Sequence, residues 1–154
     1  ILVLFSLISF PCWSADFDNG SVAYDGGDFA TALREWTPLA EQGDAVSQYN
    51  LGVMYGYGQE GVPQDDKTAV KWYTLAAEQE HARAQSNLGF MYAKGHGVPQ
   101  DYVYAHMWWN IAASNGNKVA TENRGIIAKD MTPSQIEKAQ ELAQKCVAKS
   151  YKGC

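Results

Sequence analysis

Two stretches of the chain repeat one another at a nearly constant distance. The segment AVSQYNLGVMY, which begins at Ala45, realigns with ARAQSNLGFMY, which begins 37 residues later at Ala82 (45 to 82). The motif GVPQD recurs 36 residues apart (61 to 97). A third, partial copy aligns Trp36 with Tyr73 and Gly43 with Glu80. Self-similarity at a period of 20–50 residues is typical of repeat architectures, so it constrains the fold more than any other feature of the sequence.

Each copy has helical spacing twice, with a break between. Leu51 and Tyr55 share one helix face, on which Gly52 allows a neighbouring helix to approach. Aspartates stand where helix N-caps are needed, at Asp44, at Asp65 or Asp66, and at Asp101. Glycine and proline break the chain between the helices. Each copy is therefore predicted to be a helix–loop–helix hairpin that buries its apolar face only by stacking on neighbours. We expect an all-α protein, an α-solenoid.

The C-terminal part predicts an end cap. Thr132-Pro133-Ser134-Gln135 is a capping box with proline at the first helical position. An apolar stripe follows at helical spacing and predicts a helix to about Lys149, made by Ile136, Ala139, Leu142 and Ala143. A solenoid needs such a helix to cover its last apolar face. We predict one repeat domain over residues 15–154, consisting of a partial repeat (28–44), full repeats (45–81 and 82–117) and a C-terminal cap (118–154).

The spacings LG-x-MY, GVPQD, A-x-x-W and AA resemble those of Sel1-like repeats, which are relatives of tetratricopeptide repeats. The resemblance covers residues 28–117 and implies the same α-solenoid fold. One departure concerns the turn after the second helix, where Gly43 and Gly116 are replaced by Glu80 in the middle copy. A left-handed cap costs a residue other than glycine about 1 kcal/mol, so we expect that turn to be looser or differently shaped.

The first ten residues carry no charge. As a helix they would span about 15 Å, against about 30 Å for a bilayer core, so they predict no stable membrane anchor. Pro11 and small residues follow, which predicts a partial signal peptide over residues 1–14 and a periplasmic or secreted protein. The alternative is a buried apolar N-terminal strand. Removal of this segment takes Cys12 with it.

The two remaining cysteines are Cys146 and Cys154. An even number in an oxidising compartment predicts a disulfide. A continuous helix would hold these two about 12 Å apart along its axis, so the chain has to turn back, and Gly153 offers the place. The alternative is two unpaired thiols.

Several function classes find no support in the sequence. Seventeen acidic against twelve basic residues leave a net charge of −5 without a basic run, which argues against a nucleic-acid partner. The GxGxxG match that begins at Gly56 follows a predicted helix, whereas a dinucleotide site needs it after a strand. The three histidines His81, His96 and His106 lack metal-ligand spacing. The SxxK, SDN and KTG signatures of serine β-lactamases are absent. We expect no cofactor, no metal and no catalysis.

The resemblance implies that the first helices of successive hairpins line a concave groove. One copy would contribute Val46, Tyr49, Asn50, Val53 and Tyr57, and the next would contribute Arg83, Ser86, Asn87, Phe90 and Lys94. Asn50 and Asn87 would then hydrogen-bond the backbone of an extended peptide, with Arg83 and Lys94 available for a carboxylate. The alternative is that the asparagines tie loops together. Because Trp72 and Trp108 recur with the motif, we expect them in the core.

Two hypotheses for function follow. The first is an exported, monomeric, non-catalytic module that binds another protein or an extended peptide through this groove. The second is a cell-wall-directed factor that binds or hydrolyses peptidoglycan or β-lactam-like ligands. A shallow channel without clustered titratable groups favours the first hypothesis. A pocket that joins a nucleophile to a carboxylate of raised pKa favours the second.

Overall fold

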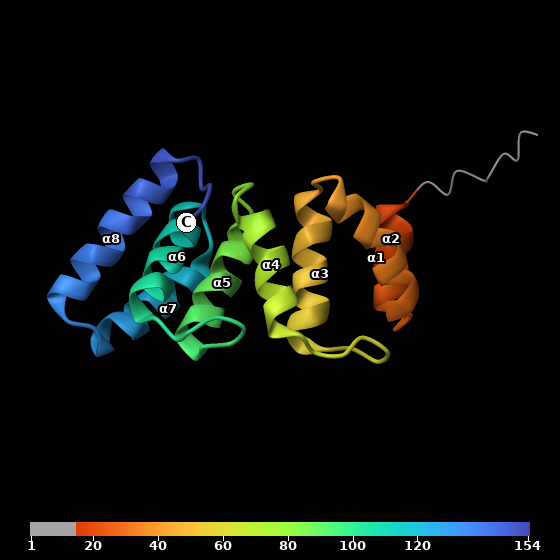
Figure 1. Cartoon of the computed structure of the whole chain (residues 1–154), viewed down its shortest axis with the longest axis horizontal. Coiled ribbons are helices and arrows are strands. Elements are labelled where there is room, and N and C mark those ends of the chain that lie inside the picture. The colour runs from red at the N-terminus through yellow and green to blue at the C-terminus, as the bar shows by residue number, and fades with distance from the viewer. Residues whose placement is uncertain (1–14) are drawn as a thin grey trace, which may run out of the picture.

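The computed structural model of the protein describes residues 15–154, and the predicted signal segment 1–14 lies outside them (Figure 1). Within this range the chain is helical and forms no strand apart from a single bridge between Gln59 and Val62. The elements are α1 (Phe17–Asp25), α2 (Phe29–Glu41), α3 (Ala45–Tyr57), α4 (Asp66–Ala77), α5 (Ala82–Lys94), α6 (Tyr102–Ser114), α7 (Lys118–Ile127), the 3-10 helix η1 (Ala128–Asp130) and α8 (Pro133–Ala148). The predicted all-α class is confirmed.

The helices pack as successive hairpins. α1 packs on α2, α3 on α4 and α5 on α6, and each second helix also packs on the first helix of the next hairpin. Figure 1 shows these pairs following one another along the long axis of the molecule. This alternation of contacts makes an α-solenoid, as the repeats predict.

The first hairpin includes a helix that the sequence analysis did not predict. α1 is capped by Asp16, whose carboxylate accepts hydrogen bonds from the backbone N–H groups of Asp18 and Asn19. A short turn from Gly26 to Asp28 joins it to α2, in place of the long loop of the other hairpins. The backbone N–H of Asp16 also donates to the buried carboxylate of Glu35 at 3.2 Å, which fixes the start of α1 against α2.

A glycine in the first helix of each hairpin receives an aromatic ring from the second. A Cβ built on these glycines would come within 2.5 or 2.6 Å of the ring, at Gly20 with Trp36, Gly52 with Tyr73, and Gly89 with Trp109. Such distances leave no room for a side chain. The glycines therefore set how closely the two helices of a hairpin approach.

The turn at Glu80 corrects an expectation from the sequence. Glu80 adopts the left-handed conformation, with φ of 65°, just as Gly43 does with φ of 100°. Glu80 N–H donates to Ala77 O at 3.1 Å and His81 N–H donates to Ala76 O at 3.2 Å, the same pair of bonds that closes the Gly43 turn. The turn is neither looser nor differently shaped, because these bonds and the start of α5 hold the glutamate in the strained conformation.

Side-chain caps begin the helices. The caps predicted at Asp44 and Asp101 are present, and of the two candidates before α4 it is Asp65 that caps. α5 is unusual, because the imidazole Nδ1 of His81 accepts the hydrogen bond from Ala84 N–H at 3.3 Å.

The two GVPQD loops differ in their surroundings. Gly97, in the second loop, packs onto the start of α4, and a Cβ on it would lie 2.4 Å from the carbonyl oxygen of Asp66. The equivalent Gly61 has no neighbouring atom within 4 Å of such a Cβ. The loop of the third hairpin therefore contacts the second hairpin, whereas the loop of the second has no such contact at this glycine.

The C-terminal cap closes the last hairpin. The Thr132 capping box is present, and α8 packs along α6. A disulfide joins Cys146 to Cys154 with their Cα atoms 5.5 Å apart, so the predicted pairing is confirmed. The tail turns back so far that Gly153 N–H donates to the Glu78 carboxylate at 3.1 Å.

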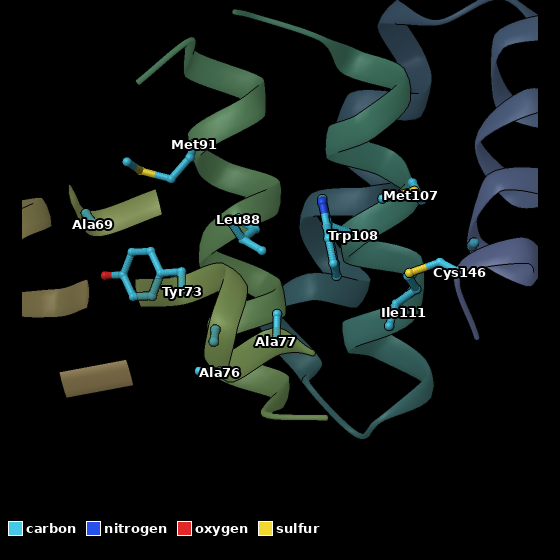
Figure 2. Close-up of a cluster of buried hydrophobic side chains, with 12 residues drawn as sticks. Ala69, Tyr73, Ala76, Ala77, Leu88, Met91, Met107, Trp108, Ile111 and Cys146 are labelled. Atoms are coloured by element: carbon cyan, nitrogen blue, oxygen red, sulfur yellow. The ribbon is translucent and has the colours of Figure 1, made fainter. Parts of the chain in front are cut away.

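The residues that recur with the repeat motif lie in the core. Trp72 and Trp108 are both buried, as predicted. Figure 2 shows Cys146 of α8 beside Met107 and Ile111 of α6, while Tyr73 lies at the opposite side of the same cluster and its ring points away from these three residues. Tyr73 is thereby directed toward α3 and Gly52.

Candidate functional site

The helices α3, α5 and α7 carry matching residues at matching positions. Counted from the caps Asp44, His81 and Asn117, the sixth residue is an asparagine on each of α3, α5 and α7. The ninth residue is apolar on each. We call these sets the asparagine row (Asn50, Asn87, Asn123) and the apolar row (Val53, Phe90, Ile126).

Three cavities follow one another between these helices. The first, of about 270 Å³, lies between the α1–α2 hairpin and α3. The second, of about 180 Å³, is lined from α3, α4, α5 and α7. The third, of about 390 Å³, is lined from α5, α6 and α7 and shares Phe90 and Asn123 with the second. We call the three together the groove.

Most of the predicted binding residues line the groove. Tyr49, Asn50 and Val53 line the first cavity. The second is lined by Tyr57, Ser86, Asn87 and Phe90, and the third by Phe90 and Lys94. Val46 and Arg83 line none of the three. Arg83 instead lies near Tyr49, where its charge opposes the rise in the pKa of Tyr49 that burial causes, and the His81 ring stacks on Tyr49 at 4.7 Å.

Two predicted residues have structural contacts of their own. Ser86 is only 7% exposed, and its carbonyl oxygen accepts the indole N–H of Trp109 at 3.0 Å. The Asn87 side chain lies near enough to the Tyr73 hydroxyl to oppose the rise in the pKa of Tyr73 that burial causes, so its amide faces partly into the protein. Asn50 and Asn123 have no side-chain hydrogen bond to any residue within 15–154. Their amides are therefore the freer members of the asparagine row.

The sequence analysis missed the contribution of α7. Val119, Asn123 and Ile126 of this helix line the second or third cavity. A signal was present, because Gly116-Asn117 repeats the Gly43-Asp44 pair that precedes α3. The pair predicts a further first helix, with an asparagine six residues after its cap.

The groove offers apolar contact more than acid–base chemistry. The carboxylates with resolved pKa shifts among residues 15–154 are Asp28, Asp65 and Glu141. Hydrogen bonds from Thr31, Thr68 and Lys145 respectively hold their pKa values below the usual range. None of the three lines the groove. Ser21 in the first cavity donates its hydroxyl to Phe17 O within its own helix.

Residues 15–154 meet the requirements of neither a metal site nor a membrane-spanning helix. No group of His, Cys, Asp or Glu side chains within residues 15–154 is placed to hold a metal ion. No helix in that range combines the length and the apolar character needed to cross a membrane.

The family model of the Sel1 repeat matches residues 45–81 and 82–117. The chain is a Sel1 repeat protein. Such repeats form a non-catalytic interaction fold that generally mediates contacts between proteins. The two matched repeats of this Sel1 repeat protein share the helix pair, the GVPQD loop and the glycine against which an aromatic ring packs, which we call the glycine notch.

Two solved structures resemble this Sel1 repeat protein. One is a protective antigen present in uropathogenic Escherichia coli strains that displays an SLR fold. It has a TM-score of 0.79 and 31% sequence identity, over 86% of this chain and 30% of that chain. The other is a Sel1 repeat protein from Oxalobacter formigenes, with a TM-score of 0.61 and 39% identity over 67% of this chain and 31% of that chain. The chain thus spans less than a third of either. No curated protein matches it.

Proposed function

We propose that this Sel1 repeat protein binds another protein, or an extended peptide segment of one, through the groove and without catalysis. The observation that carries the proposal is the asparagine row beside the apolar row. The two rows offer hydrogen bonds and apolar contact at equivalent positions on the alternate helices α3, α5 and α7.

The asparagine row suits a peptide backbone. A carboxamide has two donor hydrogens and an acceptor oxygen, so it can pair with both the C=O and the N–H of a peptide. An extended segment leaves these groups unpaired along its length. Asn50 and Asn123 can each make such bonds without breaking one inside the protein.

Several large apolar side chains of the groove are exposed rather than packed in the core. Tyr57, Phe90, Val119 and Ile126 are 72%, 43%, 59% and 60% exposed, and all four line the second or third cavity. Contiguous exposed apolar side chains rimmed by polar groups are typical of interaction sites. Lys94 at the third cavity and Arg83 beside Tyr49 add positive charge for a carboxylate of the partner.

We further propose that the protein is exported and monomeric, with residues 15–154 as one domain after a signal segment at 1–14. The disulfide supports export, because such bonds persist in oxidising compartments. The alternative, a cell-wall-directed factor, is favoured by no specific observation among residues 15–154.

Capture of a partner from a periplasmic extract tests the proposal. The double variant Asn50→Ala/Asn123→Ala removes the two free amides, and we expect it to lose the partner that the wild-type chain captures. Gln140→Ala/Gln144→Ala is the matched control, since these exposed amides lie on α8. Equal capture by the wild type and the groove variant would refute binding through the groove.

Folding is checked in parallel. Exposed polar substitutions usually change the free energy of unfolding by less than about 0.5 kcal/mol, so both double variants should melt like the wild type. Leu88→Ala, in the core, should instead cost about 2–5 kcal/mol and lose capture through unfolding. Asn87→Ala should have an effect between these two, because it also removes the amide that lies near the buried Tyr73 hydroxyl.

A further inference from the structure

We propose that the first cavity of the groove binds a cationic side chain, a lysine or an arginine of the bound segment. This inference rests on the proposed function and specifies the partner, which carries a basic residue where it meets the α1–α2 hairpin. It is carried by the side chains that line this cavity, at the N-terminal end of the solenoid (Figure 1), and by the charge of the segment that builds it.

Aromatic rings from three helices line the first cavity. They belong to Tyr24 of α1, Trp36 of α2 and Tyr49 of α3. The ring centroids of Tyr24 and Trp36 lie 5.5 Å apart, with the ring planes tilted by 36°. The face of an aromatic ring carries partial negative charge, so it attracts a cation that comes within about 6 Å of the ring centroid. Three such rings around one cavity favour a cationic occupant over an anionic one.

The lining also contains a carboxylate. Asp25 lines the first cavity, and the other residues of 15–154 that line it include no lysine, arginine or histidine. The Asp25 carboxylate has no hydrogen bond or ion pair with any residue within 15–154. Its charge is therefore available to a partner. A carboxylate and an ammonium or guanidinium group make the stronger, charge-assisted kind of hydrogen bond.

The lining changes from apolar to charged in the same order as a basic side chain does. Trp36 is 3% exposed and Val53 is half-buried, whereas Asp25 is exposed. Lysine and arginine have an apolar stem that packs on apolar surface and a charged head that stays in contact with water. The stem fits against Trp36 and Val53, and the head then meets the carboxylate without losing all of its hydration.

The segment that builds the first cavity is strongly acidic. Residues 15–57, which contain α1, α2 and α3, hold seven acidic residues and one basic residue, a net charge of −6. The basic residue is Arg34, whose guanidinium lies 3.1 Å from the buried carboxylate of Glu35. Residues 58–154 hold ten acidic and eleven basic residues, a net charge of +1. A cationic group is therefore attracted to the end of the groove that contains the first cavity.

The other two cavities lack this combination. The residues of 15–154 that line the second cavity include no carboxylate, and those that line the third include Lys94 as well as Asp130. Arg83 lies near Tyr49 but lines none of the three. A basic residue of the partner is thus expected at the first cavity. A carboxylate of the partner is expected further along, toward Lys94, so the charges give the bound segment a direction.

NMR titrations of the isotope-labelled protein with four unlabelled peptides test the inference. The peptides are acetyl-Gly-Ala-X-Ala-Gly-amide, in which X is lysine, arginine, norleucine or glutamate. We expect the lysine and arginine peptides to shift the indole N–H resonance of Trp36 and the side-chain amide resonances of Asn50, because both residues line the first cavity. Norleucine has the apolar stem without the charge, so its peptide should bind at least about fivefold more weakly. The glutamate peptide should cause no saturable shift.

Two matched variants separate the cavity from the overall charge. Asp25→Asn removes the carboxylate of the cavity and should weaken binding of the lysine peptide by about fivefold. Glu41→Gln makes the same change in net charge, and Glu41 is also an exposed residue at the end of its helix, but it lines none of the three cavities. We expect it to weaken binding by less than about twofold. Backbone amide spectra show whether both variants fold like the wild type.

The outcomes separate this inference from the proposed function. The inference is wrong if the norleucine peptide binds as tightly as the lysine peptide, if Asp25→Asn and Glu41→Gln weaken binding equally, or if no peptide shifts the Trp36 resonance. The proposed function still stands in those cases when the Asn50→Ala/Asn123→Ala variant fails to capture the partner from the extract. It falls only when that variant captures the partner as well as the wild type does.

Discussion

The Cα of Gly89 lies directly against the indole ring of Trp109. A Cβ added to Gly89 would come within 2.6 Å of both Cδ1 and Nε1 of that ring. The indole N–H donates to Ser86 O at 3.0 Å, one turn earlier on the same helix, so the ring cannot move away without losing this bond. Gly125 holds the equivalent position on α7, eight residues after the cap, but no atom lies within 4 Å of a Cβ built there.

This pair gives a matched test of helix packing. Gly89→Ala should lower the free energy of unfolding by about 1–3 kcal/mol, because the added methyl group overpacks the contact with Trp109. Gly125→Ala should raise it by about 0.5–1 kcal/mol, because alanine favours the helix and the space is open. Urea titration of both variants measures the difference. Equal effects of the two substitutions would contradict the close packing of Trp109 on Gly89.

The Glu80 turn predicts a stabilising substitution. Glu80→Gly should raise the free energy of unfolding by about 1 kcal/mol, since glycine adopts a φ of 65° without the steric cost of a side chain. Gly43→Ala, at the equivalent turn with φ of 100°, should lower it by a similar amount. Thermal melts can show both shifts. A drop in melting temperature for Glu80→Gly would mean that the glutamate side chain makes a stabilising contribution of its own.

The disulfide should stabilise the C-terminal tail. The closed loop runs from Cys146 to Cys154, and the chain-entropy formula gives about 2.5 kcal/mol for a loop of about nine residues. Cys154→Ser should cost that amount, and non-reducing mass spectrometry of the wild type should show one linked peptide. Hydrogen exchange should rise first in residues 149–154 and at the end of α8. An equal rise throughout the repeats would argue against a local role.

Stability should fall as the pH is lowered below about 6.5. Burial, and after it the positive charge of Arg83, lowers the pKa of His81, while the carboxylate of Asp44 opposes this shift. The Nδ1 atom of His81 accepts the capping hydrogen bond from Ala84 N–H, and Tyr49 stacks on the imidazole ring. The folded protein thus favours the neutral ring. This contribution is complete above the unfolded pKa of about 6.5 and is lost as the pH falls below it, through the lowered folded pKa.

The substitution His81→Asn isolates this effect. Asparagine keeps a capping oxygen but does not titrate, so the variant should lose less stability over the same pH range. The remaining loss is assigned to His106, whose pKa is also lowered, chiefly by burial and then by Arg124. Urea titrations at several pH values measure both chains. Identical pH profiles would show that His81 plays no part.

The repeats made the two central hairpins predictable from sequence. Their helices are specified by side chains that recur together, such as Leu51 with Leu88 and Asp65 with Asp101, so each copy supports the interpretation of the other. α1 escaped prediction because it is short and lacks both the LG-x-MY and GVPQD motifs, and Gly20 alone gives a weak signal. The position of α8 against α6 depends on contacts between distant helices, which no local pattern contains.

The candidate site was predictable in part for the same reason. Asn50 and Asn87 were predictable because they align in the two copies of the repeat, whereas Asn123 lies after the second copy, where the repeat motif is no longer recognisable. That Ser86 is nearly buried depends on Trp109, which is 23 positions away in sequence. The volumes of the cavities depend on side-chain conformations, which no residue pattern records.

The contact between Gly97 and the start of α4 bears on the order in which the hairpins unfold. It links the second and third hairpins through the chain's second GVPQD loop, while Gly61 makes no equivalent link to the first hairpin. In a solenoid each unit is stabilised by its immediate neighbours alone. The α1–α2 pair packs on α3 alone and lacks a close backbone contact like that of Gly97, although Val62 of the first GVPQD loop is buried in its cluster. We therefore expect this pair to unfold at lower denaturant than the rest. Unfolding followed at Trp36 would then precede unfolding followed at Trp108, so the chain would not behave as a single cooperative unit.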